Sequence, residues 1–558
     1  MNWRYRLLLL LFSALFGLIT FRLFYWQVVR ASDLSALGRM QYGQTVKIPA
    51  KRGEIRTSDG FPIATNRISY TVFANPKEVK NKDQISETLA PLLGVDIASI
   101  SAELSLNLYW VPLQKGVDTD KKTELEKLNL PGVGFEQDYS RFYPEASMAA
   151  QLIGFLGKGQ SGLDKGYFGV EGYYDRLLAG KDGEAIQIHD AFGKPVLAKT
   201  QVSEQVDGSS LILSIDRSVQ FLVESKLKEG VEKYGASSGM IGIMNPETGE
   251  IIALAAYPTF DPKNFSKYQD ELYKNPLITN LYEPGSTFKP LIMSAALDSK
   301  VVTPETKCNT CSGPVSIGGY TIHTWNDEYY KNTNMVDVIM HSDNTGMVFV
   351  GQKLGLDRLI DYLGKFGIGS LTGIDLQGEI SSFLKPKEDW HTVDLATASF
   401  GQGISITPIE LLSAVSAIAN EGKRMQPHVV SAVETPDGSV TKINTKQLDA
   451  PIDPKTAKVM TEIMVNAVNK GEASFARLKD YRIAGKTGTA SIPIQGHYDS
   501  NQTIASFVGF APADSPKFVM LVILDRPTSS IYGAETAAPI FFSIAKDLLS
   551  YYGISPSN

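Results

Sequence analysis

The chain begins with an apolar run that is long enough to cross a membrane. It covers residues 7–29, and about 20 apolar residues suffice for a helix to span the hydrocarbon core. Four residues interrupt it: Ser13, Thr20, Arg22 and Gln27. Arg4 and Arg6 precede the run, and Trp and Tyr residues flank it on both sides. Basic residues favour the cytoplasm and aromatic residues the interfaces, so residues 1–29 are predicted to form a cytoplasmic tip and a transmembrane anchor.

A cleaved secretory signal is the alternative interpretation of this segment. Its apolar core would be residues 7–19. A signal needs small residues for cleavage directly after that core, whereas bulky side chains occupy residues 21–26. The pattern therefore favours a retained anchor, with everything after about residue 30 outside the membrane.

Residues 30–205 alternate short strand-like runs with polar helical stretches. Helices are predicted at residues 85–93 and 123–128, and a third, at 171–180, ends in the glycine that is typical of a helix C-terminus. The region shows no nucleophile beside a base and no metal-ligand cluster. We therefore expect a mixed α/β pedestal that serves as a binding or spacer module.

A second pattern occupies residues 206–558. Residues 211–215 read as a strand and 218–234 as a helix. Two strand-like runs follow, at 240–244 and 250–256, and the turn residues Asn245-Pro246-Glu247-Thr248-Gly249 join them into a hairpin.

The end of the chain supplies further strands. Residues 504–510 and 518–524 are strand-like, and a helix is predicted over 534–551. Strands from both ends of the region can pair in one antiparallel sheet, while the sequence between them is largely helical. Residues 206–558 are therefore predicted to form an α+β catalytic domain, an antiparallel sheet flanked by helices with a helical subdomain.

Composition limits the possibilities further. A chain of 558 residues is too long for one hydrophobic core, which suggests roughly two to four modules. The formal net charge of −6 gives no reason to expect nucleic acid, which favours a basic surface. Cys308 and Cys311 have one nearby candidate ligand, His323, too few for structural zinc. A local disulfide or two free thiols is favoured, and redox catalysis is a weaker third interpretation.

Candidate chemistry begins at Ser286 and Lys289, which stand three residues apart ahead of an apolar run. On a helix this spacing places both side chains on one face, where a desolvated lysine can take the serine proton. The spacing S-x-x-K occurs by chance in most chains of this size. The pair therefore needs support from elsewhere in the sequence.

Two later motifs provide that support. Ser342-Asp343-Asn344 interrupts two helical runs 56 residues after Ser286, although alone it would read as a turn. Lys486-Thr487-Gly488 follows 144 residues later, in a stretch of small residues that suggests an edge strand open to a ligand; a solvated loop is the alternative. The trio in this order is far more specific than any one motif.

With this trio the chain resembles the class B penicillin-binding proteins, membrane-anchored peptidoglycan D,D-transpeptidases. Further matching stretches in the second half are residues 245–251 and 399–403, and in the first half 52–55, 141–144 and 169–172. The first half also departs from the family. Residues 57–60 read Thr-Ser-Asp-Gly in place of Asp-Arg-Asn-Gly, and Gln151 stands where a histidine is common.

The resemblance implies a role for each motif. Ser286 would attack the carbonyl between two D-alanines of a stem peptide, with Lys289 as its base, and an amine of a neighbouring stem would resolve the acyl-enzyme into a cross-link. Ser342 would relay the proton to the leaving amine, and Asn344 would hold Lys289 and the substrate amide. β-Lactams would acylate the same serine.

The third motif would bind the substrate. The resemblance assigns the terminal carboxylate to Lys486, Thr487 and Thr489, with Gly488 between them in the substrate-binding strand. The backbone N–H groups of Ser286 and Thr489 would form the oxyanion hole, worth about 3 kcal/mol per donor. No cofactor or metal ion is implied.

Two other functions use the same residues. A D,D-carboxypeptidase or β-lactamase-type hydrolase must activate water, and the sequence offers no identifiable deacylating glutamate. A non-catalytic scaffold of this fold would not need the intact trio. The resemblance further implies a bacterial inner-membrane protein with an extracytoplasmic catalytic domain and a membrane-embedded glycosyltransferase partner. Residues 537–541 and the modest pedestal favour the division type.

The anchor predicts an intact N-terminus. Mass spectrometry of the protein purified from membranes should give the mass of a chain that retains residues 1–29. Loss of about the first 30 residues would instead identify a cleaved signal.

Overall fold

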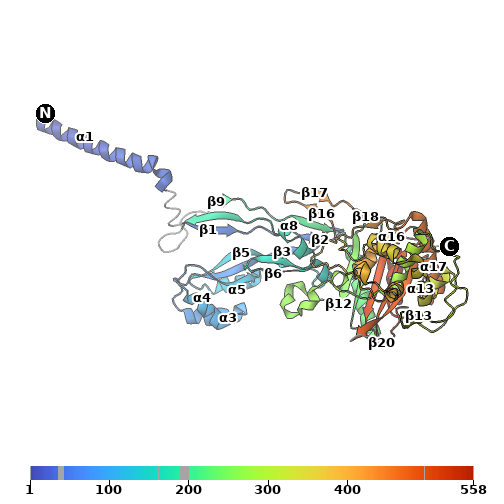
Figure 1. Ribbon diagram of the computed structural model, residues 1–558. Helices are drawn as coiled ribbons and strands as arrows, with labels where there is room; N and C mark the ends of the chain where they lie inside the picture. The colour runs from blue at the N-terminus through green and yellow to red at the C-terminus, as the bar shows by residue number, and fades with distance from the viewer. Residues whose placement is uncertain (1, 35–42, 161, 189–199, 495–496, 557–558) are drawn as a thin grey trace. The chain divides into compact units, whose positions relative to one another are not determined.

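The computed structural model describes residues 2–34, 43–160, 162–188, 200–494 and 497–556 (Figure 1). The chain divides into two compact units. The first comprises Met1–Arg52, Asn66–Ser140 and Ala179–Gly208, and the second comprises Gly53–Thr65, Arg141–Leu178 and Ser209–Asn558. Each unit is described by itself below.

The first unit opens with the predicted membrane-spanning helix. Helix α1 (Trp3–Phe24) continues into a π-helical turn, η1 (Tyr25–Val29). Together they form an apolar helix of 27 residues with no buried part. At 1.5 Å per residue such a helix is about 40 Å long, which exceeds the hydrocarbon core of a bilayer.

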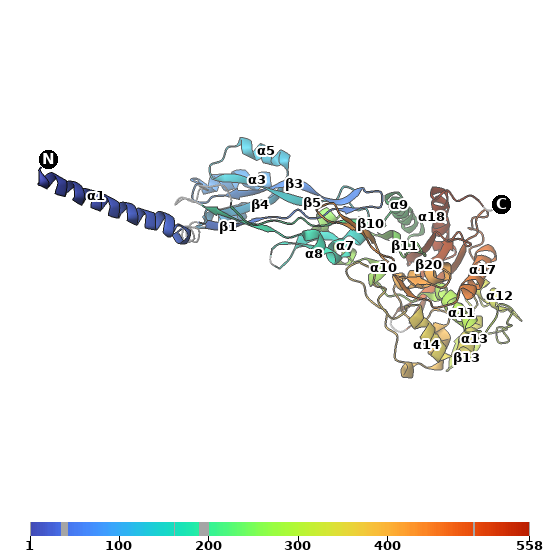
Figure 2. The same ribbon diagram turned by 90° about the horizontal axis from the view of Figure 1, so that it is seen from above.

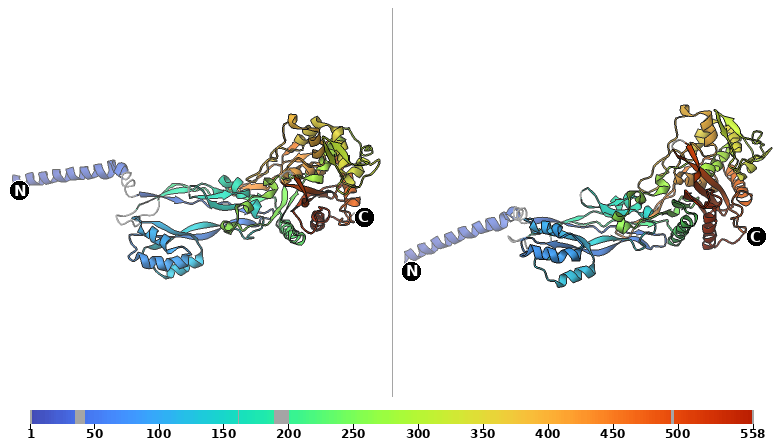
Figure 3. Two further views of the ribbon diagram at one scale, coloured as in Figure 1. Left: turned by 60° about the horizontal axis from the view of Figure 1, so that its bottom comes forward. Right: turned by 90° about the horizontal axis from the view of Figure 1, so that it is seen from below.

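The rest of the first unit is a mixed α/β body. Helices α3 (Lys82–Leu93) and α4 (Ile97–Ser105) pack on each other beside strand β4 (Val111–Val117), which pairs with the later residues of β3 (Pro62–Ala74). In both views of Figure 3 these blue helices lie against the blue strands. Helix α5 (Thr119–Lys127) follows β4. The helices predicted near residues 85–93 and 123–128 are confirmed.

A separate antiparallel sheet completes this unit. It has the strand order β1 (Gly43–Ile48), β8 (Gly183–Ile188) and β9 (Thr200–Ser203). Residues distant in sequence pair there, for example Thr45 with Ile186. The chain therefore returns to this unit after passing through the second one.

The second unit is built on a five-stranded antiparallel sheet. Its order is β12-β11-β21-β20-β19. The strands are β11 (Ser238–Met244), β12 (Ile251–Tyr257), β19 (Ala484–Ile494), β20 (His497–Ala511) and β21 (Phe518–Asp525). Gly242 lies opposite Leu521, so strands from both ends of the region pair as the sequence predicts. β19 lies at one edge, again as predicted.

Helices cover both faces of this sheet. α9 (Arg217–Tyr234) and α18 (Ala537–Tyr551) pack on each other and on one face, with α18 against β20 and β21 (Figure 2). α16 (Pro408–Ala419) packs on the other face, beside the helical subdomain. Along β21, Met520 and Val522 belong to the core under α18, whereas Val519 and Leu521 belong to the opposite core. The strand is apolar throughout because both of its faces are buried.

One predicted helix differs from the structure. Residues 171–180 were expected to form a single helix, but the chain forms two short ones, α7 (Gly169–Tyr173) and α8 (Asp175–Ala179). The break falls at Tyr174, whose hydroxyl donates a hydrogen bond to Asp375 at 2.9 Å. Glu171 is fully buried and pairs with Arg141 at 2.7 Å. These long-range bonds outweigh the local helical preference.

The packing of α18 predicts a large loss of stability for Phe541→Ala. Phe541 is 0% exposed and its ring lies 4.5 Å from that of Phe507. Its truncation should lower the free energy of unfolding by about 3–5 kcal/mol, measured by urea denaturation in detergent. Phe383→Ala is the control, because Phe383 is 78% exposed and should change stability by less than about 0.5 kcal/mol. Equal losses in both variants would contradict this packing.

Candidate active site

Ser286 lies in a short 3-10 turn, η4 (Gly285–Phe288), that leads directly into α11 (Lys289–Asp298). The sequence predicted the first turn of an α-helix, and the structure tightens this turn. Gly285 has a φ of 55°, a left-handed conformation that suits glycine. Its N–H donates to the carbonyl of Gly401 at 2.9 Å, so the glycine-rich 399–403 stretch supports the turn that holds Ser286.

Lys289 joins the first two motifs. Its side chain is fully buried, and its Nζ donates hydrogen bonds to the Ser342 carbonyl at 2.6 Å, the Ser342 Oγ at 3.2 Å and the Asn344 Oδ1 at 2.8 Å. Within the described parts of the chain, no hydrogen bond joins Lys289 to Ser286. The lysine is therefore fixed by the Ser-Asp-Asn loop, while the half-buried Ser286 stands one turn away.

The protonation of Lys289 follows from these surroundings. Burial, the largest cause, and the charge of Lys486 lower its pKa to about 7, although Glu472 and Asp343 act in the opposite direction. An ordinary lysine is fully charged at neutral pH. Here a large fraction of the amine is neutral at pH 7, so that it can accept a proton from a hydroxyl.

The Ser-Asp-Asn loop is rigidly built. It connects α12 (Met335–Met340) with α13 (Asn344–Leu354). Asp343 caps α13 by accepting hydrogen bonds from the Gly346 N–H at 3.0 Å and the Thr345 hydroxyl at 2.7 Å. Ser342 has a φ of 56°, which is uncommon for a residue with a side chain. Such backbone strain concentrates at functional sites, where the surrounding structure enforces it.

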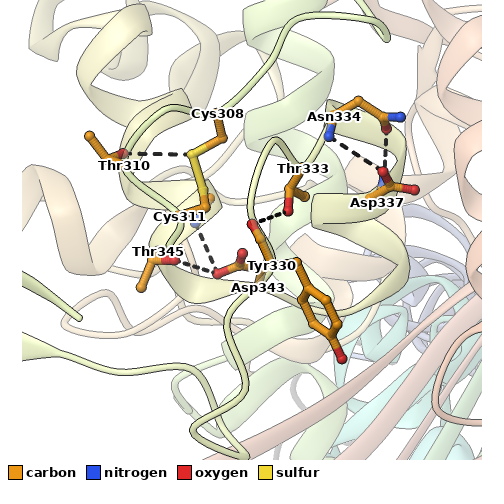
Figure 4. The surroundings of a disulfide bond; sticks show 10 residues. Cys308, Thr310, Cys311, Tyr330, Thr333, Asn334, Asp337, Asp343 and Thr345 are labelled. Atoms are coloured by element: carbon orange, nitrogen blue, oxygen red, sulfur yellow. Dashed lines mark hydrogen bonds between the residues drawn. A yellow bond between two sulfur atoms is a disulfide. The ribbon is translucent and has the colours of Figure 1, made fainter. Parts of the chain in front are cut away.

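A disulfide between Cys308 and Cys311 stands beside this loop. The sequence left a disulfide and free thiols open, and the structure contains the disulfide. Both cysteines are buried, and Asp343 and Thr345 lie in the surroundings that Figure 4 draws. The segment before α12 is therefore covalently tightened where it approaches the Ser-Asp-Asn loop.

The third motif lies on the edge strand β19, against the Ser286 turn. A Cβ at Gly488 would come within 2.8 Å of the Thr287 side chain, so only glycine allows this approach. Lys486 is buried, and its Nζ donates to the Thr487 Oγ1 at 2.9 Å. Thr489 Oγ1 accepts a hydrogen bond from the Gly533 N–H at 3.0 Å. All three motifs therefore meet around one turn of helix.

Glu472 is a member of this site that sequence reasoning missed. Its Oε2 accepts a hydrogen bond from the Thr487 hydroxyl at 2.5 Å. It follows directly after Gly471, at the end of α17 (Pro454–Lys470), and no local pattern distinguishes it from a surface glutamate. Only the packing of α17 against β19 brings it to the motif.

Across the described ranges, no group of three or more His, Cys, Asp or Glu side chains is placed to hold a metal ion. The functional groups are hydroxyls, amines, one amide and one carboxylate. Such a set suits nucleophilic acyl transfer with a lysine base.

Comparison with known proteins extends these observations over the whole chain. The penicillin binding protein transpeptidase domain family matches residues 239–546, and the penicillin-binding protein dimerisation domain family matches residues 47–213. Stage V sporulation protein D of Bacillus subtilis (strain 168) is 34% identical, over 98% of this chain and 86% of the relative.

Two further proteins are similar to this chain over nearly its whole length. Peptidoglycan D,D-transpeptidase FtsI of Escherichia coli (strain K12) is 30% identical, over 100% of this chain and 93% of the relative. The crystal structure of a peptidoglycan synthetase from Bifidobacterium adolescentis ATCC 15703 is 27% identical, with a TM-score of 0.75. That similarity covers 92% of this chain and 98% of the other.

Proposed function

Because the chain belongs to the class B penicillin-binding proteins, as its motifs predicted, we propose that it cross-links peptidoglycan stem peptides by D,D-transpeptidation. The observation that carries the proposal is the buried amine of Lys289. It is hydrogen-bonded to Ser342 and Asn344, one turn from Ser286. A base in this position suits a serine that must lose its proton to attack a carbonyl.

The reaction proceeds in two steps. The Ser286 Oγ attacks the carbonyl between the two terminal D-alanines, and neutral Lys289 takes its proton. The C–N bond then breaks, and Ser342 passes a proton to the departing D-alanine amine. Ser342 regains its proton from Lys289. An amine of a neighbouring stem peptide then attacks the acyl carbon, the C–O bond to Ser286 breaks, and the proton that the amine loses passes through neutral Lys289 to the Ser286 Oγ.

The edge strand β19 contributes most of the substrate-binding groups. Lys486 and Thr489 bind the terminal carboxylate. Thr487, to which the resemblance assigns the same role, donates its hydroxyl hydrogen to Glu472 instead. Asn344 bonds the substrate amide while it holds Lys289. The N–H groups of Ser286 and Thr489 stabilise the oxyanion. An edge strand suits this role because every second N–H group faces away from its sheet.

Membrane attachment follows from the N-terminal helix. The proposal places α1 in the bacterial inner membrane with Arg4 and Arg6 in the cytoplasm, and the catalytic unit on the outer side where peptidoglycan lies. Class B proteins lack a glycan polymerase domain, so a membrane-embedded glycosyltransferase is the expected partner. The division-type role that residues 537–541 favour stays a prediction.

A penicillin adduct tests the nucleophile and the fate of the acyl group. Incubation of the detergent-purified chain with benzylpenicillin should add one drug mass to the intact protein, and peptide mapping should place it on Ser286. Ser286→Ala should abolish the adduct. A lasting adduct supports the transpeptidase, rapid loss indicates a hydrolase, and no adduct on the wild-type chain would indicate a non-catalytic scaffold.

The lowered pKa of Lys289 predicts the acidic limb of the pH profile. The base must be neutral, so the rate of penicillin acylation should rise with pH and reach half its plateau near pH 7, where the pKa of Lys289 lies. Stopped-flow measurement of acylation between about pH 5.5 and 9.5 gives this midpoint. Lys289→Met should lower the rate at least about 100-fold and remove this limb. A midpoint near 10, as for an ordinary lysine, would contradict the assignment.

A further inference from the structure

One carboxylate of the site takes no part in the reaction described above. Glu472 is half-buried and accepts a hydrogen bond from the Thr487 hydroxyl, which in turn accepts one from Lys486 Nζ at 2.9 Å. Glu472, Thr487 and Lys486 border a cavity of about 10 Å³, together with residues of α17. This volume is at the lower limit for one water molecule. Thr487 contacts both Lys486 and Glu472 directly.

The direction of these bonds is determined by the number of hydrogens. An ionised carboxylate and an ammonium leave one arrangement, in which Thr487 donates its single hydrogen to Glu472 and accepts one from Lys486. Thr487 then has no hydrogen left for a substrate carboxylate. Thr489, whose Oγ1 accepts a bond from Gly533, keeps its own hydrogen for that purpose.

The carboxylate of Glu472 does not bond directly to the Lys486 ammonium in the part of the chain that the structure describes. Among the described residues, no ion pair within 4.0 Å joins Glu472 to Lys486, whose Nζ bonds the Thr487 Oγ1 and, at 3.3 Å, the Thr487 carbonyl. Of the three ammonium hydrogens one is left over. The arrangement therefore fixes the cation and still leaves it a hydrogen bond for the carboxylate of a substrate.

Within the described ranges, few charged groups shift the pKa values of Lys289 and Lys486. Burial lowers the pKa of Lys486, and Glu472 raises it. Burial and Lys486 lower the pKa of Lys289, while Glu472 and Asp343 raise it. The groups that face the pair thus come from α17's end, β19, the start of α11 and the Ser-Asp-Asn loop, and Glu472 acts on both amines.

We propose that Glu472 is a positioning residue of the acyl-transfer site, which holds Lys486 as a fixed ammonium through the Thr487 hydroxyl and supplies the negative charge that both buried amines share. The inference rests on the proposed function and deepens it. The reaction needs one lysine neutral and the other charged. Glu472 therefore sets the pH range in which both conditions hold.

The variant Glu472→Gln tests the charge alone, because the glutamine oxygen still accepts the Thr487 hydrogen bond. The acylation rate of the full chain by a fluorescent penicillin is measured between about pH 5.5 and 9.5. Removal of the charge lowers the pKa of both lysines. Lys289 acts as the neutral base, so its pKa sets the limb of the profile that rises with pH. Lys486 acts as the cation, so its pKa sets the limb that falls at alkaline pH. Both limbs should therefore move to lower pH, by roughly one unit.

The pH profiles of the acylation rate should therefore cross for the wild type and Glu472→Gln. Glu472→Gln should acylate faster than the wild type below the wild-type acidic midpoint and more slowly on the alkaline side. A merely structural defect would lower the rate at every pH without moving either midpoint. Glu472→Asp, which keeps the charge, should restore the wild-type midpoints even if its rate is lower.

Glu462→Gln is the matched control. Glu462 lies on α17, which ends two residues before Glu472, and it is exposed and pairs with Arg482. The variant therefore removes the same charge away from the lysines and should leave both midpoints unchanged. If wild-type and Glu472→Gln profiles superimpose, the role of Glu472 is overturned while the proposed function stands. If the wild-type chain is not acylated, the proposed function fails and this inference with it.

Discussion

The buried amine of Lys289 is the constraint on which the catalytic unit depends. A charged ammonium loses its hydration energy when it is buried, so the group must be neutralised or surrounded by acceptors. Here the Ser342 carbonyl, the Ser342 hydroxyl and the Asn344 amide oxygen all accept hydrogen bonds from it. Those acceptors come from a loop more than 50 residues away, so that loop must be held accurately against the start of α11.

Several independent structural features hold the Ser-Asp-Asn loop in position. The Asp343 cap fixes the first turn of α13, and the Cys308–Cys311 disulfide tightens the segment that precedes the loop. Ser342 between them adopts a left-handed conformation. On the other side, Gly401 and Gly488 permit backbone to approach the Ser286 turn at distances that a side chain would prevent. The site is rigid because packing, capping and a covalent bond act on the same few residues.

Electrostatics explains why a second lysine belongs to the site. Two buried amines at close range repel each other when both are charged, which lowers the pKa of Lys289. The carboxylate of Glu472 moderates this effect on both. A positively charged lysine next to a neutral one is the arrangement that binding a carboxylate and activating a hydroxyl require together. Burial thus has a chemical function here, in addition to its cost in stability.

Most secondary structure could be predicted from local pattern. The apolar run of α1, the hairpin of β11 and β12, and helix α9 follow from periodicity, caps and turn residues, all of which act over a few positions. The helix predicted over 171–180 is broken, because the Tyr174–Asp375 hydrogen bond and the buried Glu171 depend on contacts with distant residues. Local preference is weak compared with such contacts.

The sequence by itself determined the residue types and the order of the three motifs, and through them the family, because these motifs in this order are characteristic of that family. Only the tertiary structure decided the pKa of Lys289, the pairing of Cys308 with Cys311 and the presence of Glu472 beside Thr487. The pKa of Lys289 and the place of Glu472 depend on burial and on distances between segments far apart in the chain, and the disulfide depends on the backbone geometry that brings the two sulfur atoms together. A sequence pattern records none of these quantities.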